Sequence, residues 1–464
     1  MQKIISYNSD YISKKSNNVI TYTLTFCSIL IFSFSYIDSN LSFLFGIIFG
    51  SYLLLKARVE YLLPILILYI VKNDFSYGIV SNEFKIQNIN DSSINIAPIG
   101  VIIIFFRVLL EYFFKFNTFP TNIRTLIFLW LIVLIPVLVG TIIAFLNSNS
   151  NWTRSIRFAL VPGFFFYGFI LYKNYNYKNI NLTLNFISFL VFLMFLGFFM
   201  SHLGFFFISI VLCYGAYNFY KKGIKKIYGL FLLIITIYFS ITNTFTTIGI
   251  CFLTLFFIYK LNKHKDNTII FSNFNKLFFI FFPIFFSFLI ASIGLFNNYS
   301  PDILYSEMQL LENSTSFWQK LLIKTFSDRL PFWTSALEQI LSKPQFIVES
   351  GKPLSLYITG LPSEWNVGSH NTIIELIRIE GIFSGPLILF FYLWVLHKVY
   401  KVLQNNISIL SNYLAISIFS VSTIGLFTGD FVGDMTVGPL IWGSAGFLLA
   451  FFYSRNSFIS INQK

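Results

Sequence analysis

The segment Ile123–Leu146, IRTLIFLWLIVLIPVLVGTIIAFL, is the clearest indication of the fold class of this chain. Its only charged residue is Arg124, close to its start, and almost everything after it is apolar. An α-helix needs about 20 such residues to cross the hydrocarbon core of a bilayer. Because that core offers no water, the backbone must satisfy its own hydrogen bonds, as a helix does. The stretch therefore predicts a transmembrane helix.

Similar apolar runs recur along the whole chain of 464 residues, of which 56% are hydrophobic, 20% aromatic and only 11% charged. A soluble fold of this length does not need so much apolar surface. The predicted fold class is an all-α polytopic membrane protein with about 12–14 transmembrane helices, because one candidate span is short and two pairs are tightly connected. The fourteen candidate spans lie at about 19–37, 41–55, 59–71, 99–114, 123–146, 158–172, 182–200, 203–220, 227–241, 244–260, 277–296, 372–396, 409–428 and 436–453.

The distribution of charge predicts the orientation of the chain. The formal net charge is +13, but the basic residues fall in short loops between apolar runs, which argues against nucleic acid as a partner. With the N-terminus in the cytoplasm, the inner loops contain 21 of the 32 basic residues and three acidic residues. The outer loops contain nine basic and thirteen acidic residues. The positive-inside rule then predicts that both termini are cytoplasmic.

This topology divides the chain into transmembrane helices over 1–296, a large outer loop over 297–371, and transmembrane helices over 372–464. Within the loop, Ser316–Phe326 has apolar residues at helical spacing and predicts an amphipathic interfacial helix. The segment Ser327–Pro344 predicts a second helix, and a stretch rich in glycine and proline follows it. A long loop with helices of its own is usually functional, so this loop is a candidate cover for a site.

His370 is the histidine whose position best fits a chemical role. It lies in EWNVGSHNTIIELIRIEG, Glu364–Gly381, where the outer loop meets an apolar run. A neutral imidazole at this place could accept a proton from a hydroxyl group near neutral pH. The alternative is a purely structural junction in which Ser369 or Asn371 caps the following helix. His202, at the outer end of another span, is better explained by a turn.

Asn371, Glu375 and Arg378 share one stripe of the helix that follows His370, at about 100° per residue. Ionisable residues at that depth are costly and normally face the interior of a helix bundle. They could contact a substrate, or Glu375 and Arg378 could form an ion pair that only locks helix packing. Arg107 and Glu111 form a similar pair in an earlier span, for which we favour the structural interpretation.

Several arginines and tryptophans lie on the predicted outer side. Arg154, Arg157 and Arg329 could hold a diphosphate, because the planar guanidinium presents a fork of donors. Trp333 and Trp365 could stack against sugar rings, although an aromatic belt at the membrane surface is the simpler explanation. The chain contains no HExxH, CxxC, P-loop or GxGxxG motif, so we predict no metal site and no cofactor.

Taken in order, a set of these residues resembles the last large periplasmic loop and following span of the O-antigen polymerase and O-antigen ligase superfamily. The resemblance covers about 70 residues, and the pattern R…W…P…HN…L…G…G is matched by Arg329, Trp333, Pro344, His370, Asn371, Gly381 and Gly385. Many members also have a Ser-Arg pair at the outer end of a middle span. The comparable segment here, TNTFTTIG at Thr242–Gly249, has no arginine.

The resemblance implies a metal-independent glycosyltransferase in the bacterial inner membrane, with its active face in the periplasm. A polymerase would transfer a growing glycan from undecaprenyl diphosphate to the next lipid-linked repeat unit. In this scheme His370 accepts the proton of the acceptor, Arg329 holds the diphosphate with Arg154 and Arg157, and Asn371 orients His370 or a sugar hydroxyl. Arg378, Trp333 and Trp365 complete the candidate substrate-binding set.

Three functions remain open at this point. The first is a polymerase; the second is an O-antigen ligase, which would use lipid A-core as the acceptor. The third is a lipid-linked oligosaccharide flippase, against which the large outer loop argues. The expected partners are an undecaprenyl-diphosphate-linked oligosaccharide and membrane lipid, with a chain-length regulator as a further candidate.

Overall fold

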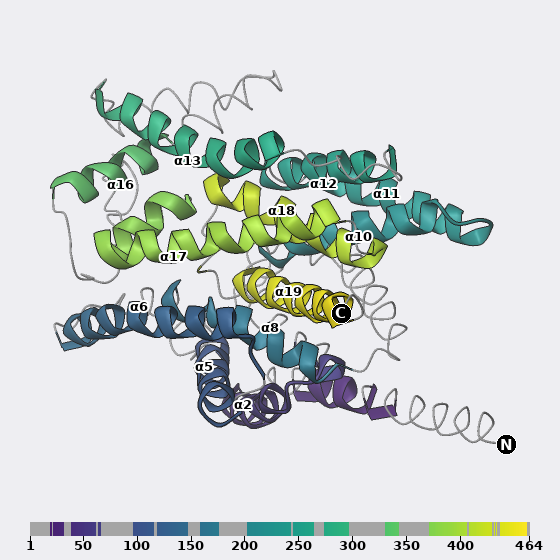
Figure 1. Ribbon diagram of the computed structural model, residues 1–464, viewed down its shortest axis with the longest axis horizontal. Helices are drawn as coiled ribbons and strands as arrows, with labels where there is room; N and C mark the ends of the chain where they lie inside the picture. The colour runs from purple at the N-terminus through teal and green to yellow at the C-terminus, as the bar shows by residue number, and fades with distance from the viewer. Residues whose placement is uncertain are drawn as a thin grey trace. The chain divides into compact units, whose positions relative to one another are not determined.

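A computed structural model describes most of the helical parts of the chain (Figure 1). The described residues are helical apart from short turns, and no strand occurs among them. The expected all-α fold class is therefore confirmed at this level. The described ranges are 19–20, 22–31, 39–61, 64–65, 96–115, 118–146, 158–175, 202–242, 245–263, 273–296, 330–342, 371–405, 408–428, 431, 433 and 437–461.

Helix bounds follow the apolar runs within a few residues in most cases, because a helix is the structure that satisfies the backbone hydrogen bonds of an apolar run away from water. The helices are α2 (Ser39–Lys56), α5 (Ile96–Phe114), α6 (Thr121–Leu146), α8 (Gly163–Lys173), α10 (His202–Phe219), α11 (Ile224–Thr242), α12 (Phe245–Lys263), α13 (Asn273–Phe296), α16 (Leu330–Ser342), α17 (Thr372–Asn405), α18 (Ile409–Thr428) and α19 (Val437–Ile461). A 3₁₀ turn, η1, covers Val59–Tyr61. The predicted span 182–200 and the predicted helix Ser316–Phe326 lie outside the described residues.

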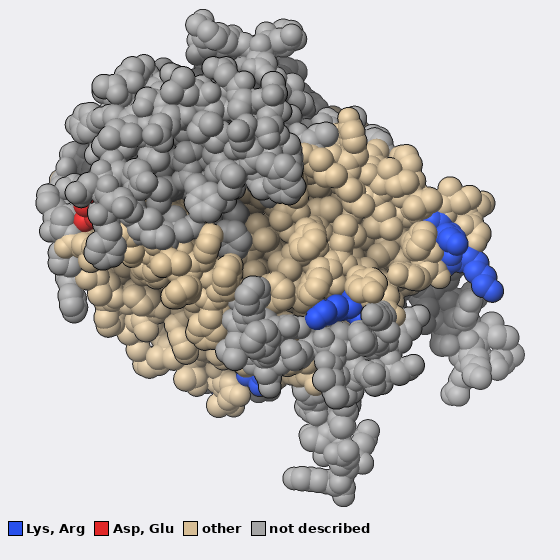
Figure 2. Space-filling view, turned by 90° about the horizontal axis from the view of Figure 1, so that it is seen from above, with Lys and Arg blue, Asp and Glu red and all other residues tan. Residues whose placement is uncertain are grey.

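Five of the described helices, namely α6, α11, α17, α18 and α19, are long and apolar enough to cross a membrane. Shorter apolar segments occur in α2, α8, α10, α12 and α13. Large apolar side chains are exposed along these helices, for example Ile135, Ile234 and Phe285, which are 60–67% exposed. In the face drawn in Figure 2, uncharged residues make up nearly all of the described surface. These features identify a membrane protein.

The chain divides into two compact units, which we describe separately. The first contains residues 1–121, 163–239 and 435–464, and the second contains residues 122–162 and 240–434. Helices α2, α5, α8, α10, α11 and α19 belong mainly to the first unit, and α6, α12, α13, α16, α17 and α18 to the second.

Within the first unit, α8 crosses α19 at a close contact made possible by glycine. A Cβ atom at Gly446 would collide with the backbone carbonyl of Phe165, and one at Gly168 would collide with the carbonyl of Gly443. Such small-residue crossings let helix backbones approach closely, which is how many membrane helices associate. Trp442 of α19 packs edge-on against Phe165, with ring centroids 6.4 Å apart.

A polar network joins the C-terminal ends of α5 and α8 in the same unit. Glu111 accepts hydrogen bonds from Arg107 at 2.6 Å, from Lys115 at 3.1 Å and from the Thr118 hydroxyl at 2.7 Å. Lys173 at the end of α8 then donates to the Thr118 hydroxyl at 2.9 Å. The predicted Arg107–Glu111 pair is therefore confirmed, and its partners give it a structural role.

In the second unit, α17 is not the continuous helix that the apolar run 372–396 predicts. Gly381 has φ 76° and ψ 176°, a conformation that is essentially restricted to glycine, and the chain bends there. A Cβ atom at Gly385 would lie 2.5 Å from the Leu376 carbonyl oxygen, so the two parts of α17 pack against each other. Residues 372–380 form a short, buried helix, whereas residues 382–405 would extend about 36 Å, enough to span a membrane.

Helix α16 confirms the helix predicted within Ser327–Pro344 and packs against α13 and the short part of α17 (Figure 1). Elsewhere in this unit, α12, α13 and α18 share an aromatic core. The rings of Phe257, Phe279 and Phe419 lie with centroids 5.4–6.3 Å apart. This core supports the helices between which the first turn of α17 is held.

Candidate functional site

The candidate site is built around the first turn of α17, which Asn371 caps. Its side-chain Oδ1 accepts hydrogen bonds from the backbone N–H groups of Ile373 at 3.0 Å and Ile374 at 3.1 Å. An asparagine in this position satisfies donors that have no partner within the helix. The capping role that the sequence offers for Asn371 is therefore confirmed.

The same amide links α17 to α13. Its Nδ2 donates to the Ser287 hydroxyl at 2.7 Å, and that hydroxyl donates to the Pro283 carbonyl at 2.7 Å. Asn371 and Ser287 are both fully buried. A buried amide with partners for both its oxygen and its nitrogen holds one orientation, because breaking either contact leaves an unsatisfied polar group.

Two further contacts anchor this turn to other helices. The Thr372 hydroxyl donates to the Gly425 carbonyl of α18 at 3.1 Å. Ile374 lies in an apolar cluster with Trp333 and Ala336 of α16 and with Ala291 of α13. The first turn of α17 is therefore fixed by α13, α16 and α18 at once, over four consecutive residues.

One turn further along, Glu375 and Arg378 form the ion pair predicted as one alternative. The Arg378 guanidinium donates from Nε to Oε2 at 3.0 Å and from Nη2 to Oε1 at 2.6 Å. The two side chains are 0% and 4% exposed, so the pair lies inside the protein. Planar pairs of this kind are strong and directional. The geometry favours a packing role for Arg378, and a contact with substrate stays a prediction.

Glu380 adds a second buried carboxyl group at the end of the short helix, immediately before the bend at Gly381. Charged residues inside a membrane protein are expensive and are usually kept for function or for specific pairing. The short helix thus carries three ionisable side chains in nine residues, all of them buried.

Trp333 does not present its ring to solvent in this structure. It is 2% exposed and packs between α13 and α17, where its indole Nε1 has no hydrogen-bond partner among the described residues. An indole N–H that is buried usually finds a partner. Trp333 therefore fastens α16 to the first turn of α17, and the prediction that it stacks on a sugar remains untested.

The remaining predicted site residues, Arg154, Arg157, Arg329, Trp365 and His370, lie outside the described residues. Two of them adjoin the site in sequence, because Arg329 directly precedes α16 and His370 directly precedes Asn371.

Sequence reasoning missed Ser287 and the meaning of two glycines. Ser287 is 84 residues from Asn371 in the chain, and a serine inside an apolar helix carries no signal of such a contact. Gly381 and Gly385 were noted only as parts of a pattern. Their spacing fits the bend and the close approach of the two parts of α17. The signal in the sequence that could have predicted the bend is the pair Gly381 and Gly385, which directly follows a stretch with three ionisable residues.

Comparison with known proteins leaves the family open. No protein-family model, no curated protein and no solved structure matches this chain.

Proposed function

We propose that this protein is an inner-membrane glycosyltransferase that polymerises undecaprenyl-diphosphate-linked oligosaccharide repeat units into a polysaccharide. In the reaction, a hydroxyl oxygen of the incoming repeat unit attacks C1 of the sugar that links the growing chain to its carrier. The bond between C1 and the diphosphate oxygen breaks, and undecaprenyl diphosphate leaves with the bonding electrons. His370 takes the hydroxyl proton, and Arg329 stabilises the charge that develops on the diphosphate.

The observation that supports this proposal is the packing of the first turn of α17 against α16. Trp333 is four residues after Arg329, and Ile374 is four residues after His370; the two side chains belong to one apolar cluster. A general base and a phosphate-binding arginine that act on one glycosidic bond must start from neighbouring backbone positions. Helix α16 begins at Leu330, the residue after Arg329, and α17 begins at Thr372, two residues after His370. The contact between the first turns of these helices supports the proposal.

The rigid anchoring of Asn371 also fits a catalytic junction. A general base loses much of its effect when its position varies by an ångström or so. Hydrogen bonds to α13 and α18 and the contact with α16 hold the turn that follows His370. In this proposal Asn371 is a positioning residue, since its amide oxygen and nitrogen both bind the protein.

The test is His370→Ala in the native host, with the polysaccharide resolved on a gel. Loss of a general base typically slows a reaction by about 10²–10⁴-fold. We therefore expect the ladder of long chains to collapse to single repeat units attached to lipid A-core, at normal protein abundance. His202→Ala is the control and should leave the ladder unchanged.

The pattern of loss separates the other functions. If the protein is a ligase, His370→Ala leaves nothing attached to lipid A-core while lipid-linked polymer accumulates in the periplasm. If it is a flippase, lipid-linked single repeats accumulate on the cytoplasmic face. A normal ladder at normal abundance would contradict both enzymatic assignments of His370. The junction at His370 would then have only the structural role of a helix start capped by Asn371.

A further inference from the structure

The turn between α10 and α11 gathers four lysines in six residues. It reads YKKGIKK from Tyr220, and Lys221, Lys222, Lys225 and Lys226 lie around the glycine. Gly223 has φ +69°, a left-handed conformation that lets the chain reverse within this short connection. The four ammonium groups are therefore held at one end of a helical hairpin, where they repel one another.

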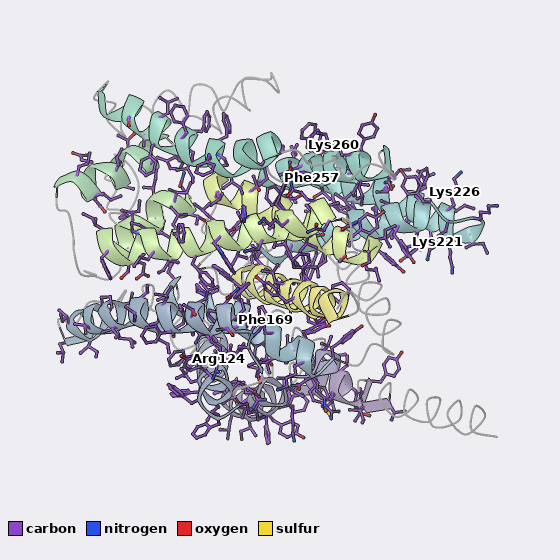
Figure 3. The ribbon with its side chains drawn as sticks, viewed as in Figure 1. Arg124, Phe169, Lys221, Lys226, Phe257 and Lys260 are labelled. Carbon is purple, nitrogen blue, oxygen red and sulfur yellow. The ribbon has the colours of Figure 1, made fainter. Side chains whose placement is uncertain are left out.

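The hairpin that carries these lysines is closely packed. A Cβ atom at Gly229 of α11 would lie 2.6 Å from the Gly215 carbonyl oxygen of α10, so the two backbones are almost in contact. The turn is closed by hydrogen bonds from Lys221 N to the Asn218 carbonyl at 2.9 Å and from Lys226 N to the Gly223 carbonyl at 3.0 Å. The lysines thus extend from a defined platform, and Figure 3 shows Lys221 and Lys226 at this end of the hairpin.

Nearby stretches of the chain supply no negative charge to this cluster. The sequence contains no aspartate or glutamate between Glu111 and Asp266. Aromatic rings provide some compensation, with the Lys221 ammonium 3.8 Å from the Tyr217 ring centroid and the Lys226 ammonium 5.6 Å from that of Phe219. Such contacts are worth little at exposed positions, so the cluster still attracts anions strongly.

Apolar side chains stand among the lysines and continue along α11. Ile224 is 85% exposed, Ile227 is 71% exposed, and an exposed apolar stripe continues through Ile234 and Tyr238. A soluble inorganic anion would gain nothing from these residues. A phospholipid would, because its acyl chains cover apolar surface while its phosphate meets the ammonium groups.

We propose that the α10–α11 turn is a binding site for an anionic phospholipid. The headgroup phosphate is held by Lys221, Lys222, Lys225 and Lys226, and the acyl chains lie along Ile224, Ile227 and the exposed face of α11. A lipid with two phosphates suits four lysines better than a lipid with one. This site is separate from the first turn of α17 and does not depend on the glycosyltransferase proposal.

The experiment measures cardiolipin bound to the purified full-length protein in detergent by native mass spectrometry, with phosphatidylcholine as the uncharged reference. A basic residue near an anionic lipid surface contributes about fivefold to binding, so replacing all four lysines by glutamine should weaken cardiolipin binding several hundredfold. The matched control replaces four other lysines by glutamine, namely Lys56, Lys260, Lys398 and Lys401. Three of these lie over aromatic rings as Lys221 does, and we expect a change of less than about tenfold.

Two results would overturn the proposal. Equal losses in the two quadruple variants would show that only the number of charges matters. The second arm uses Ile224→Asn with Ile227→Asn, which keeps every lysine and should weaken cardiolipin binding by about tenfold or more. If this variant binds cardiolipin like the wild type, and inorganic pyrophosphate displaces the lipid, the lysines bind free anions and the lipid site is wrong. Thermal unfolding of each variant in detergent verifies that it is folded.

Discussion

The crossing of α8 with α19 is buried at Phe165 and Gly446, and the first turn of α17 is buried too, yet the two regions are held together by opposite means. At the crossing, glycines bring two backbones into contact, and aromatic rings fill the space beside them. At the first turn of α17, side-chain hydrogen bonds and an ion pair hold the helix. Buried polar contacts add less stability than close apolar packing but fix one geometry. We infer that the crossing of α8 with α19 mainly stabilises the fold, whereas the contacts of the first turn of α17 mainly fix the position of that turn.

The largest expected effect is at the ion pair. Glu375→Gln leaves the Arg378 guanidinium buried without its charge partner, which should lower the free energy of unfolding by about 3–5 kcal/mol. Replacing both residues by leucine should restore most of this loss, because apolar residues often substitute well for a buried pair. The free energy of unfolding of the purified variants in detergent measures both effects.

The double leucine variant also separates the two possible roles of Arg378. If Arg378 contacts the substrate, this variant is stable but forms no polymer ladder; if the pair only locks packing, the ladder returns with stability. A loss below about 1 kcal/mol for Glu375→Gln would contradict the burial of the pair, because a solvated ion pair is worth no more than that.

A smaller effect is expected at the crossing of α8 and α19. Gly446→Ala forces its new methyl group against the Phe165 carbonyl and should cost about 1–3 kcal/mol. Gly443→Ala, one turn away on the same helix, is the matched control, because its methyl group would lie 3.8 Å from the nearest atom, the Phe164 carbonyl oxygen. Thermal unfolding and membrane abundance should fall only for Gly446→Ala, with activity per molecule unchanged. Equal effects at both glycines would show that the close backbone approach at Gly446 is not what stabilises the crossing.

The smallest stability effects, of about 1–2 kcal/mol, are expected at Asn371. Asn371→Ala removes both the cap and the bond to Ser287. Asn371→Ser keeps a good cap and loses that bond, as does Ser287→Ala. We expect the ladder to shorten in all three variants by more than their abundance falls, because His370 is attached directly to this turn.

Equal stability losses of about 1 kcal/mol in Asn371→Ser and Ser287→Ala would isolate the contribution of the link to α13. Full polymer length in all three variants would show that the anchoring of this turn serves stability alone. The first turn of α17 would then serve stability in the same way as the crossing of α8 with α19.

Most of the helical framework could be predicted from the sequence, because a helix in an apolar environment depends on local properties. The length of an apolar run, its period and its turn residues set where a helix begins and ends. The bounds of α18 agree with the prediction at both ends, and α16 was expected from its apolar spacing within a polar loop. The cap at Asn371 and the pair of Glu375 with Arg378 were also predictable, since both join residues within one turn.

The use of these local pieces depends on contacts between helices that lie far apart in the chain. The bend at Gly381 divides a run that would otherwise form one helix, because the short part gains a packed environment between α13, α16 and α18. The bond between Asn371 and Ser287 joins positions 84 residues apart, and the orientation of Trp333 depends on the helices beside it. Contacts of this kind arise from the approach of distant helices, and no spacing within a single helix encodes them.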